Sequence, residues 1–427
     1  MLLLLITLEQ TSLVYPPFGH TMGIHRGTPS YLALLTGRKL EVSRTEGIWA
    51  VKFPFLDNPK TFADDDELTV FAVNSGKDQI IYNIGFTGLG MYGYSGVRDS
   101  ALWNPCGITG DLSGNVFVVD RNNNRVVKLL FDGEKLLYRK SIGKFGILEG
   151  YFNDPVQVSE TDEGEIFVTD RLNNRVQVFD TTGKYLREIK GLVRPTGVFA
   201  RSSKDRFYRL KKDYLYVIDN SKQRINLLTT YGTPIRNVEY TEMGLDSARF
   251  EYIATDFYGQ VYITDSKNHC IHIFDPELNY LTSFGHKGKG DGEFLYPRGI
   301  TIWRRFGQVF VLDSWSVQYF WVGIDGWLRD IRPSRFKPGN GTTIYYFTTQ
   351  PCRVRINILG KDGKLVKRLF WSHYLKPGKH YIVWDGTDRH GKYVPPGEYT
   401  VEIKLTPLYS SRRFLKKILK GVVECIQ

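Results

Sequence analysis

The sequence is poor in cysteine and histidine, and it lacks a long apolar run. Only four cysteines and eight histidines occur among 427 residues. Cys106, Cys270, Cys352 and Cys425 lie far apart and form no C-x-x-C pair, so they resemble neither a zinc site nor a disulfide framework. Their redox state stays open between oxidising and reducing compartments. No stretch approaches the roughly 20 apolar residues of a membrane span, so no integral membrane span is expected.

Basic residues are missing in front of the apolar run at the N-terminus. The run MLLLLITLEQ is closed by Glu9, whereas a secretory signal has a charged region first and a small-residue cleavage site afterwards. Residues 1–30 are therefore interpreted either as a weak or truncated signal or as a native segment without a role in export.

Positive charge is concentrated near the C-terminus. The formal net charge is +12, and residues 338–427 hold 16 Lys plus Arg against 6 Asp plus Glu. The preceding 337 residues are almost balanced, with 41 basic against 39 acidic residues. The larger part of the chain is therefore not a globally basic nucleic-acid binder.

A repeated motif dominates the first three quarters of the sequence. A β-type run ending in Asn or Asp closes in turn at Asn74, Asp120, Asp170, Asp219, Asp265 and Asp313. The spacings are 46, 50, 49, 46 and 48 residues, and so even a period indicates a repeat architecture. Aromatic residues make up 14% of the chain and Gly occurs 42 times, which favours strands and turns.

Each repeat has the pattern of four short strands. In the second unit, CGIT, VFVVD, RVVKLL and LLYRKSIG are separated by turns rich in Gly, Asp and Asn. Four-stranded units of this length stack radially around a channel. Six units over roughly residues 46–333 predict an all-β, six-bladed β-propeller. A β-solenoid, the alternative, usually has shorter repeats and fewer strands per turn.

The links between units carry a family resemblance. FGHKGKGDGEFLYPRGI at 284–300 and IGKFGILEGYFNDPV at 142–156, followed by G-x-[IV]-[FY]-V-x-D and N-x-R-V-x-x-F-D patterns, resemble NHL repeats. The first unit departs from the pattern because Asn74 stands in place of Asp. The fourth departs through an insertion at 201–213.

After Pro338 the period stops, and a second domain is expected. CRVRINIL at 352–359, LVKRLF and the segment 379–405 have the pattern of strands joined by Gly- and Pro-rich turns. The skeleton resembles the immunoglobulin-like module of the flagellar hook-capping protein, FlgD, and consists of Trp384, Asp385, Gly386, Gly391, Gly397 and Tyr399. Bacterial surface and secreted proteins often carry this module at the C-terminus. The expected domains are 31–337 for the propeller and 338–421 for the module, with 422–427 as an extension.

Two structures are open for the segment 410–421. As a helix, it would place Phe414 and Ile418 opposite a basic face, which suits an anionic surface or an acidic partner. As a strand, it would close the sandwich, and this interpretation is favoured because the module otherwise lacks a closing strand.

One rim of the channel is the candidate binding site. In a meander, the turn between strands two and three lies on the same rim as the link to the next blade. The candidate ligand-binding residues on this rim are Arg121, Asn123, Arg125, Arg171, Asn173, Arg175, Arg194, Lys222, Arg224, Lys267, His269 and His286. Arginine forks and amides suit carboxylates, phosphates or sulfated sugars. The competing interpretation is that the repeated Asp and Arg residues only stabilise their own turn.

Catalytic and metal-binding constellations are weak in the sequence. His269 and Cys270 replace the Asn-Arg pair of other units, and with His286 they suggest a zinc site, but a packing role is favoured. Calcium binding by ADDDE at 63–67 is likewise less favoured than a solvated turn. The inner-strand stretches GIWAV, CGIT, PVQV, PTGV, YIAT and PRGI offer no carboxylate or imidazole to the channel. No catalytic residue and no cofactor are assigned.

The sequence predicts a non-catalytic binding or scaffold protein of the bacterial envelope or exterior. It would hold a protein, glycan or other anionic polymer on the rim, and the C-terminal module would anchor it to a surface. One alternative is a metal-dependent lyase or hydrolase at the channel mouth. Another is RNA binding, which the NHL resemblance implies. The expected location is extracellular, at the cell surface or periplasmic.

Overall fold

The computed structural model describes residues 10–21, 25–37, 39–56, 68–84 and 88–427. The chain forms two compact units. One unit comprises Pro16–Phe320, here called the propeller unit, and the other comprises Met1–Tyr15 together with Trp321–Gln427, here called the C-terminal unit. The start of the chain and the acidic run at 63–67 lie outside the described residues, so the predictions for a signal and for a calcium turn remain predictions.

Five blades are four-stranded antiparallel meanders whose strands follow chain order. Blade one has β3 (Thr45–Val51), β4 (Thr69–Asn74), β5 (Gln79–Ile84) and β6 (Gly88–Tyr92). Blade two has β7 (Pro105–Gly110), β8 (Asn115–Asp120), β9 (Arg125–Phe131) and β10 (Leu136–Ile142). Blade three has β11 (Pro155–Glu160), β12 (Glu165–Asp170), β13 (Arg175–Asp180) and β14 (Tyr185–Ile189). Blade four has β15 (Gly197–Arg201), β16 (Tyr214–Asp219), β17 (Arg224–Thr229) and β18 (Pro234–Glu239). Blade five has β19 (Phe250–Thr255), β20 (Val261–Asp265), β21 (Cys270–Phe274) and β22 (Tyr280–Phe284).

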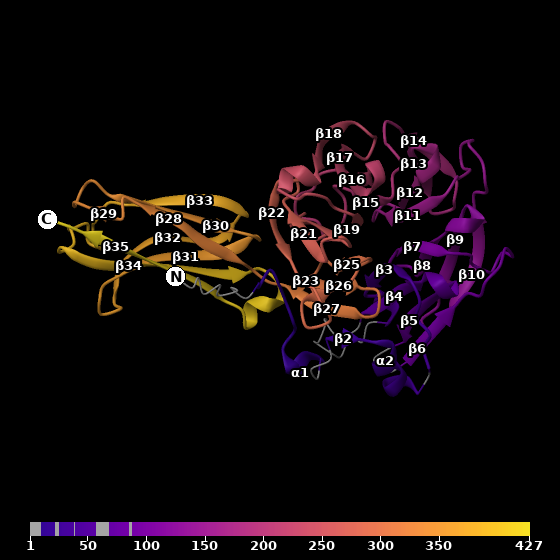
Figure 1. Ribbon diagram of the computed structural model, residues 1–427, viewed down its shortest axis with the longest axis horizontal. Coiled ribbons are helices and arrows are strands. Elements are labelled where there is room, and N and C mark those ends of the chain that lie inside the picture. Colours follow the sequence, from indigo (N-terminus) through magenta and orange to yellow (C-terminus); the bar gives the residue numbers. More distant parts are fainter. Residues whose placement is uncertain (1–9, 22–24, 38, 57–67, 85–87) are drawn as a thin grey trace. The chain divides into compact units, whose positions relative to one another are not determined.

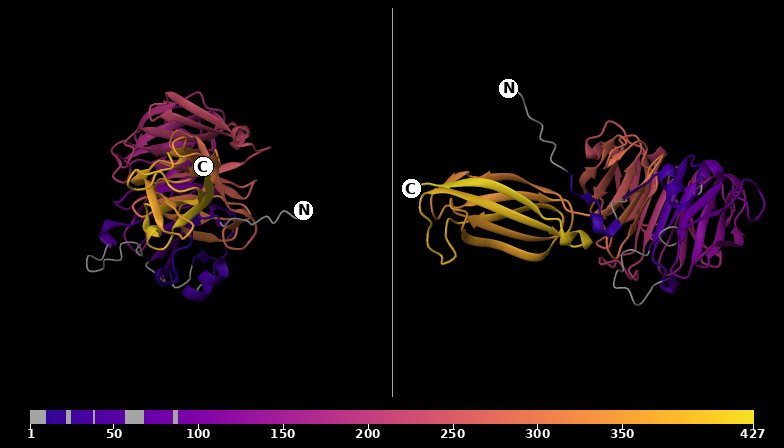
Figure 2. Two further views of the ribbon diagram at one scale, coloured as in Figure 1. Left: turned by 90° about the vertical axis from the view of Figure 1, so that its left-hand side faces the viewer. Right: turned by 90° about the horizontal axis from the view of Figure 1, so that it is seen from below.

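The sixth blade is completed from the N-terminal side. It contains β25 (Ile300–Trp303), β26 (Gln308–Leu312) and β27 (Val317–Val322), and its outer position beside β27 is taken by β2 (Arg26–Gly27). The innermost strands β3, β7, β11, β15, β19 and β25 contact one another in order, and β25 contacts β3. Figure 1 and Figure 2 show the resulting ring of blades. The six-bladed propeller is therefore confirmed.

The predicted extent of the sixth blade was wrong. The repeat was expected to continue to residue 333, but β28 (Gly326–Arg332) pairs with β30 (Thr342–Thr348) of the C-terminal unit. The structure divides the chain between Phe320 and Trp321, before the expected boundary at residue 338. The even period could not reveal this strand exchange, because β2, which takes the expected place of β28 beside β27, comes from the N-terminal side of the repeats.

Short helices, 3₁₀ turns and a two-stranded ladder lie before, within and between the blades. The α-helices are α1 (Phe18–Thr21) and α2 (Pro29–Thr36), and the hydroxyl of Thr28 caps α2 by accepting the N–H of Tyr31. The 3₁₀ turns are η1 (Pro54–Leu56), η2 (Ser75–Lys77), η3 (Arg121–Asn123), η4 (Arg171–Asn173), η5 (Asn220–Lys222) and η6 (Tyr240–Met243), and β23 (His286–Lys287) pairs with β24 (Glu293–Phe294). No helix of the described residues is long and apolar enough to cross a membrane.

Apolar residues between the blades form the propeller core. The third residue before the Asn or Asp that ends the second strand is aromatic in the first five blades and at most 1% exposed, at Phe71, Phe117, Phe167, Tyr216 and Tyr262. Each faces the next blade, and the alternating residues face the preceding one, because side chains alternate across a strand. The repeated sequence pattern thus encodes the packing between blades.

The C-terminal unit is a sandwich of two sheets. One sheet has the order β28-β30-β33, with β33 at Gly378–Trp384. The other has the order β29-β35-β34-β31-β32, with strands at Arg335–Phe336, Lys417–Cys425, Gly397–Pro407, Cys352–Leu359 and Leu365–Leu375. In the same unit, β1 (Leu13–Val14) pairs with Val322 and Trp321. The segment 410–421 begins with η7 (Ser410–Arg413) and continues into β35, so the strand interpretation of this segment is confirmed. β35 runs to Cys425 and thus includes part of the expected extension at 422–427.

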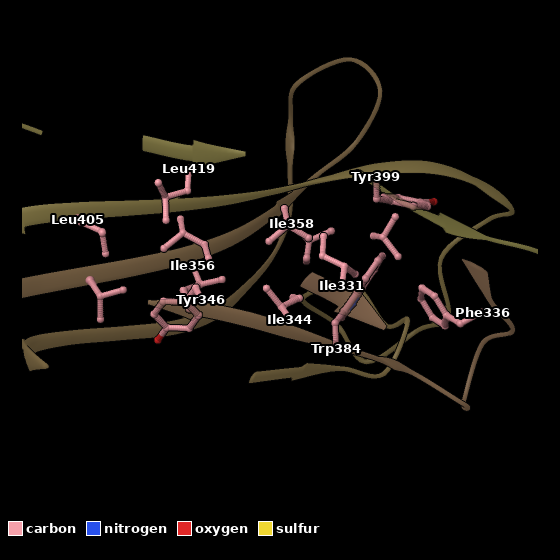
Figure 3. Packing of buried hydrophobic residues seen from close by; sticks show 14 of the residues in the cluster. Ile331, Phe336, Ile344, Tyr346, Ile356, Ile358, Trp384, Tyr399, Leu405 and Leu419 are labelled. Atoms are coloured by element: carbon pink, nitrogen blue, oxygen red, sulfur yellow. The ribbon is translucent and has the colours of Figure 1, made fainter. Parts of the chain in front are cut away.

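The residues of the W-D-G skeleton stabilise the core of this sandwich. Trp384 is fully buried, and its Nε1–H donates to the carbonyl of Thr387 at 2.9 Å. Its ring contacts Tyr399 at 5.2 Å between centroids, as Figure 3 shows, and the Tyr399 hydroxyl donates to the Pro395 carbonyl. Burial opposes ionisation of Asp385, but hydrogen bonds from Thr387 and Lys367 lower its pKa to about 2.

Candidate functional site

The repeated aspartates are buried beneath the turns that follow them. Asp120 is 0% exposed, and its carboxylate accepts the Trp103 N–H at 2.6 Å, Asn123 Nδ2 at 2.8 Å and Arg125 Nε at 2.8 Å. Trp103 lies on the link between blades, so the carboxylate joins the turn to this link. In blade one Asn74 stands in place of the aspartate, and its side-chain oxygen likewise joins the turn to the preceding segment by accepting the Ser43 N–H.

The repeated arginines complete this network. Arg125 also donates to the carbonyls of Arg98 and Ala101, and Arg175 donates to those of Leu148 and Tyr151. Both are buried, and Arg224 makes a bidentate pair with its own aspartate, Asp219. Asn123 and Asn173 donate to link carbonyls as well. The structure therefore assigns these five sequence candidates to blade stability, in agreement with the competing interpretation.

Because these ion pairs are buried, the loss of either partner would strongly destabilise the fold. Burial raises the pKa of Asp170 above its usual range, although hydrogen bonds from Asn153, Asn173 and Arg175 oppose the shift. Burial would lower the pKa of Arg175, but Asp170 and Glu188 raise it. A buried carboxylate that loses such a partner is strongly destabilising.

His269 bridges two blades. It occupies the left-handed position, with φ of 57°, that Asn124 and Asn174 occupy in blades two and three. Those asparagines accept the N–H groups of Asp154 and Arg194 in the next link, and the His269 ring contacts the Leu295 carbonyl.

The other residues of the suggested zinc site also have separate partners. Cys270 stands where Arg125 stands in blade two, and the ring of His272 meets the aspartate of the turn instead, with Nε2 at 3.1 Å from Asp265 Oδ2. His286 is exposed and pairs with Glu293 at 3.2 Å. Among the described residues, no group of three His, Cys, Asp or Glu residues is arranged to hold a metal ion.

Most of the remaining cationic candidates meet in one depression. Its volume is 460 Å³, and it is lined by five cations, here called the basic rim, namely Arg171, Arg194, Lys222, Arg249 and Lys267. Four of the five were sequence candidates, and only Arg249 was missed. Thr196, Ser221, Gln223 and Ala248 complete the described lining, which contains no carboxylate.

The basic rim continues into the mouth of the channel. A second cavity of 260 Å³ shares Arg171, Lys222 and Arg249 with the depression and adds Arg44, Arg121 and Arg298. Arg121 and Arg171 both pair with Asp154, with Arg121 Nε at 2.5 Å from Asp154 Oδ1. Each of the six blades, or the link that precedes it, thus contributes one cationic group to the mouth.

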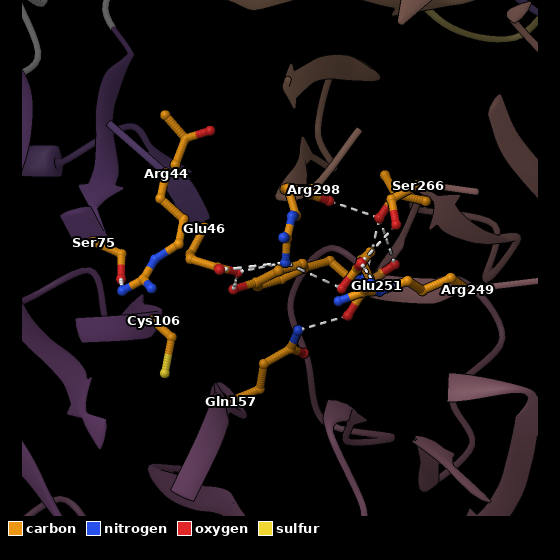
Figure 4. Close-up of polar contacts among 12 residues, drawn as sticks. Arg44, Glu46, Ser75, Cys106, Gln157, Arg249, Glu251, Ser266 and Arg298 are labelled. Carbon is orange, nitrogen blue, oxygen red and sulfur yellow. Dashed lines mark hydrogen bonds and ion pairs between the residues drawn. The ribbon is translucent and has the colours of Figure 1, made fainter. Parts of the chain in front are cut away.

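Two carboxylates of the inner strands contradict the expectation that the channel has none. Glu46 and Glu251 lie on β3 and β19, next to the stretches GIWAV and YIAT. Arg298 joins them, with its guanidinium at 3.2 Å from Glu46 and 3.4 Å from Glu251, as Figure 4 shows. Glu251 also pairs with Lys222 and with Arg249, the latter at 3.0 Å. Their position was the only available signal, because each glutamate immediately precedes one of these apolar stretches in the sequence.

The ion pairs at the mouth fix the charge state of Glu251. Burial would raise its pKa, but Lys222 and Arg298 lower it below the usual range. Burial lowers the pKa of Lys222, which Glu251 opposes. Glu251 is therefore held ionised among cations, an arrangement that positions charge and does not favour proton transfer.

Two cations of the basic rim have no such partner. Within the part of the chain that the structure describes, the side chains of Arg194 and Lys267 make no ion pair, and both are exposed. Arg194 is fixed at its backbone, where its N–H donates to Asn174 Oδ1 at 2.9 Å. These two side chains are thus available to an anionic ligand.

Comparisons with known proteins agree with this architecture. Residues 334–407 match the family model described as the FlgD Ig-like domain, and residues 245–321 match the one described as a 6-bladed beta-propeller. Protein brain tumor of Drosophila melanogaster is 29% identical over 82 residues, which are 18% of this chain and 8% of that protein. The chain therefore combines a six-bladed β-propeller with a C-terminal FlgD Ig-like domain.

Similar solved structures are propeller proteins of low identity. Virginiamycin B lyase from Staphylococcus aureus is 16% identical, with a TM-score of 0.42, and the match covers 59% of this chain and 76% of the lyase. A gluconolactonase from Xanthomonas campestris is 12% identical, with a TM-score of 0.45, and the match covers 73% of this chain and 96% of that one.

Proposed function

We propose that the propeller is a non-catalytic binding module that holds a carboxylate-, sulfate- or phosphate-bearing polymer on the basic rim. The observation that carries this proposal is the depression lined by five cations and no carboxylate among the described residues. Arg194 and Lys267 provide the free donors, and Arg171, Lys222 and Arg249 supply a positive surrounding. An anionic protein segment or an acidic glycan matches this chemistry.

The C-terminal domain supports the proposed setting of this module. The match to the FlgD Ig-like domain and the sequence resemblance to modules of bacterial surface and secreted proteins favour a protein of the bacterial envelope or exterior. In this proposal the propeller binds the ligand, and the C-terminal unit anchors or carries it. The extracellular, cell-surface or periplasmic location is part of the same proposal.

Charge reversal on the basic rim tests the proposal. Fluorescence polarisation would measure binding of the full chain to labelled heparin, polyglutamate and poly(U) at low and high salt. We expect Arg194→Glu combined with Lys267→Glu to weaken binding at least about tenfold, because two attractive contacts become repulsive. The matched control is a double charge reversal in the C-terminal unit, Lys361→Glu with Lys379→Glu, and it should retain the affinity of the wild-type protein.

The polymers separate the candidate ligands. Preference for heparin or polyglutamate over poly(U) is expected. Tight binding of poly(U) alone, falling steeply with salt, would replace this proposal with RNA binding. Equal loss of affinity in the control and rim variants would show that only net charge matters and would contradict a site on the rim.

A further inference from the structure

A cavity lies at the seam between blade six and blade one. Its volume is 430 Å³, within the range of about 300–1,000 Å³ that is usual for small-molecule sites. Apolar side chains of both blades form most of its wall, including Val70, Ala72, Ile81, Phe310, Leu312 and Val317. Residues of β2 and α2 complete the described lining.

A single small residue loosens the packing at this seam. The second residue before the Asn or Asp that ends the second strand faces the preceding blade, and Val118 packs in this way between blades one and two. The equivalent residues of the other five blades are β-branched, at Val118, Val168, Val217, Ile263 and Val311. Blade one has Ala72 instead, so the branched carbons that close the other seams are missing here.

The aromatic residue opposite Ala72 shows the consequence. The five aromatic residues at the corresponding position of blades one to five are at most 1% exposed. Phe310 of blade six is only half-buried, although its ring stacks on Tyr319 at 4.6 Å between centroids. The seam therefore differs from the other blade interfaces in both of its walls.

One part of the cavity wall contains hydrogen-bond donors without acceptors. Trp315 Nε1, Ser316 Oγ and Arg26 Nε are buried and have no hydrogen-bond partner among the described residues, and all three residues line the cavity. Ser316 is 4% exposed. Leaving such donors unpaired costs free energy, which a ligand acceptor would recover.

Two cationic groups lie near the Trp315 ring. The Arg26 guanidinium is 5.7 Å and the Lys289 ammonium 5.8 Å from the centre of the Trp315 ring. Arg26 also pairs with the exposed Asp291 at 3.3 Å and donates to the carbonyls of Lys289 and Gly290, which fixes its position. The donors and the two cations together favour a carboxylate over a cationic or neutral head group.

We propose that this seam cavity binds a single-chain amphiphile with a free carboxylate. The alkyl chain packs between Ala72 and Phe310, where burial of apolar surface stabilises the complex. The carboxylate oxygens accept hydrogen bonds from Trp315, Ser316 and Arg26. This site is separate from the basic rim, because none of the rim residues lines the cavity.

The first test compares two head groups on the same chain. Isothermal titration calorimetry of the full chain would use dodecanoate and dodecyltrimethylammonium, both below their micelle concentrations. We expect dodecanoate to bind with one-to-one stoichiometry and at least about tenfold more tightly. Absence of dodecanoate binding would overturn the proposal. Equal affinity for the two ligands would overturn the role assigned to the donors.

The second test changes the two parts of the cavity independently. Ala72→Val introduces the residue of the equivalent strands, so the fold should tolerate it, and it should weaken dodecanoate binding at least about fivefold by filling the space. Trp315→Phe keeps an aromatic ring and removes one donor, with an expected loss of about fivefold. Trp371→Phe, an exposed position of the C-terminal unit, is the matched control and should bind as the wild-type protein does. Unchanged affinity in both cavity variants would place the ligand elsewhere and contradict the proposal.

Discussion

Arginines on the same rim of the propeller differ in what they can do. Arg175 has a side chain that is 7% exposed, and it bonds Asp170, Glu188 and two link carbonyls. Arg194 is exposed, and its side chain makes no ion pair within the described chain. The first residue has its donors satisfied inside the blade, whereas the second offers them to a ligand. A repeated residue therefore stabilises the blade, and a residue outside the repeat is the better candidate for binding.

Replacement of these two arginines should have very different effects on stability. Arg175→Ala leaves the buried Asp170 carboxylate without its cation, so we expect the free energy of unfolding to fall by about 3–5 kcal/mol. Arg194→Ala, the matched control, should change it by about 0.5 kcal/mol or less, as exposed substitutions usually do. Urea denaturation followed by tryptophan fluorescence would measure both values. Similar stability of the two variants would contradict the separation of roles.

In the turn of blade five, the buried aspartate receives its hydrogen bond from a different residue than in blade two. Cys270 cannot donate as Arg125 does, and His272, two residues later in the strand, contacts Asp265 at 3.1 Å. Gln177 occupies the equivalent position of blade three, and its Nε2 donates to Asp170 Oδ2 at 3.1 Å. The break in the repeat is thus compensated within the turn.

This compensation can be tested with a pair of substitutions. His272→Gln supplies the donor that blade three uses, so we expect a change in unfolding free energy of about 1 kcal/mol or less. His272→Leu fills a similar space but leaves the buried Asp265 carboxylate without this donor. We expect it to lower the free energy of unfolding by about 1–3 kcal/mol. The midpoint of thermal unfolding at neutral pH would rank the two variants. A His272→Leu protein as stable as His272→Gln would show that the histidine serves only to fill space.

The blade pattern could be predicted from the sequence because its determinants are local. Alternating apolar residues, turn residues and the even period specify four strands per unit, and the structure confirms them in the first five blades. The channel carboxylates could not be predicted in the same way. Glu46 and Glu251 are far apart in the chain, and they become neighbours of Arg298 only when the ring closes. A candidate site made of single residues from several blades therefore requires the three-dimensional structure.

At the scale of the whole molecule, the chain closes its ring with residues from both sides of the repeat array. β2 pairs with the first two residues of β27, and the last two residues of β27 belong to the C-terminal unit. The even period predicted a blade built from consecutive strands, because a pairing between distant segments leaves no periodic trace. The paired segments are almost 300 residues apart in sequence, so this pairing closes a very long loop.

A disulfide across this closure provides the corresponding test. Gly27 and Val317 are direct partners in the antiparallel pair, where Cα atoms lie about 4.5–5.5 Å apart, a separation that a disulfide can span. A Cβ on Gly27 would meet Val317 Cγ1 at 3.0 Å, and replacing both residues by cysteine removes that methyl group. The four native cysteines are buried and free, and burial raises the pKa of Cys106, Cys270 and Cys352 to about 12, so they compete little for oxidation.

We expect the oxidised Gly27→Cys, Val317→Cys protein to be about 3 kcal/mol more stable than its reduced form, because the cross-link closes a very long loop in the unfolded chain. Thermal unfolding with and without dithiothreitol would measure the difference, and non-reducing electrophoresis would confirm the cross-link. The single variant Gly27→Cys controls for the substitution itself and should respond little to reductant. If the double variant cross-links but gains no stability, opening of this seam is not part of the unfolding of the propeller. If it does not cross-link, β2 does not occupy the outer position of blade six in solution, and the seam cavity would then lack the wall that Arg26 provides.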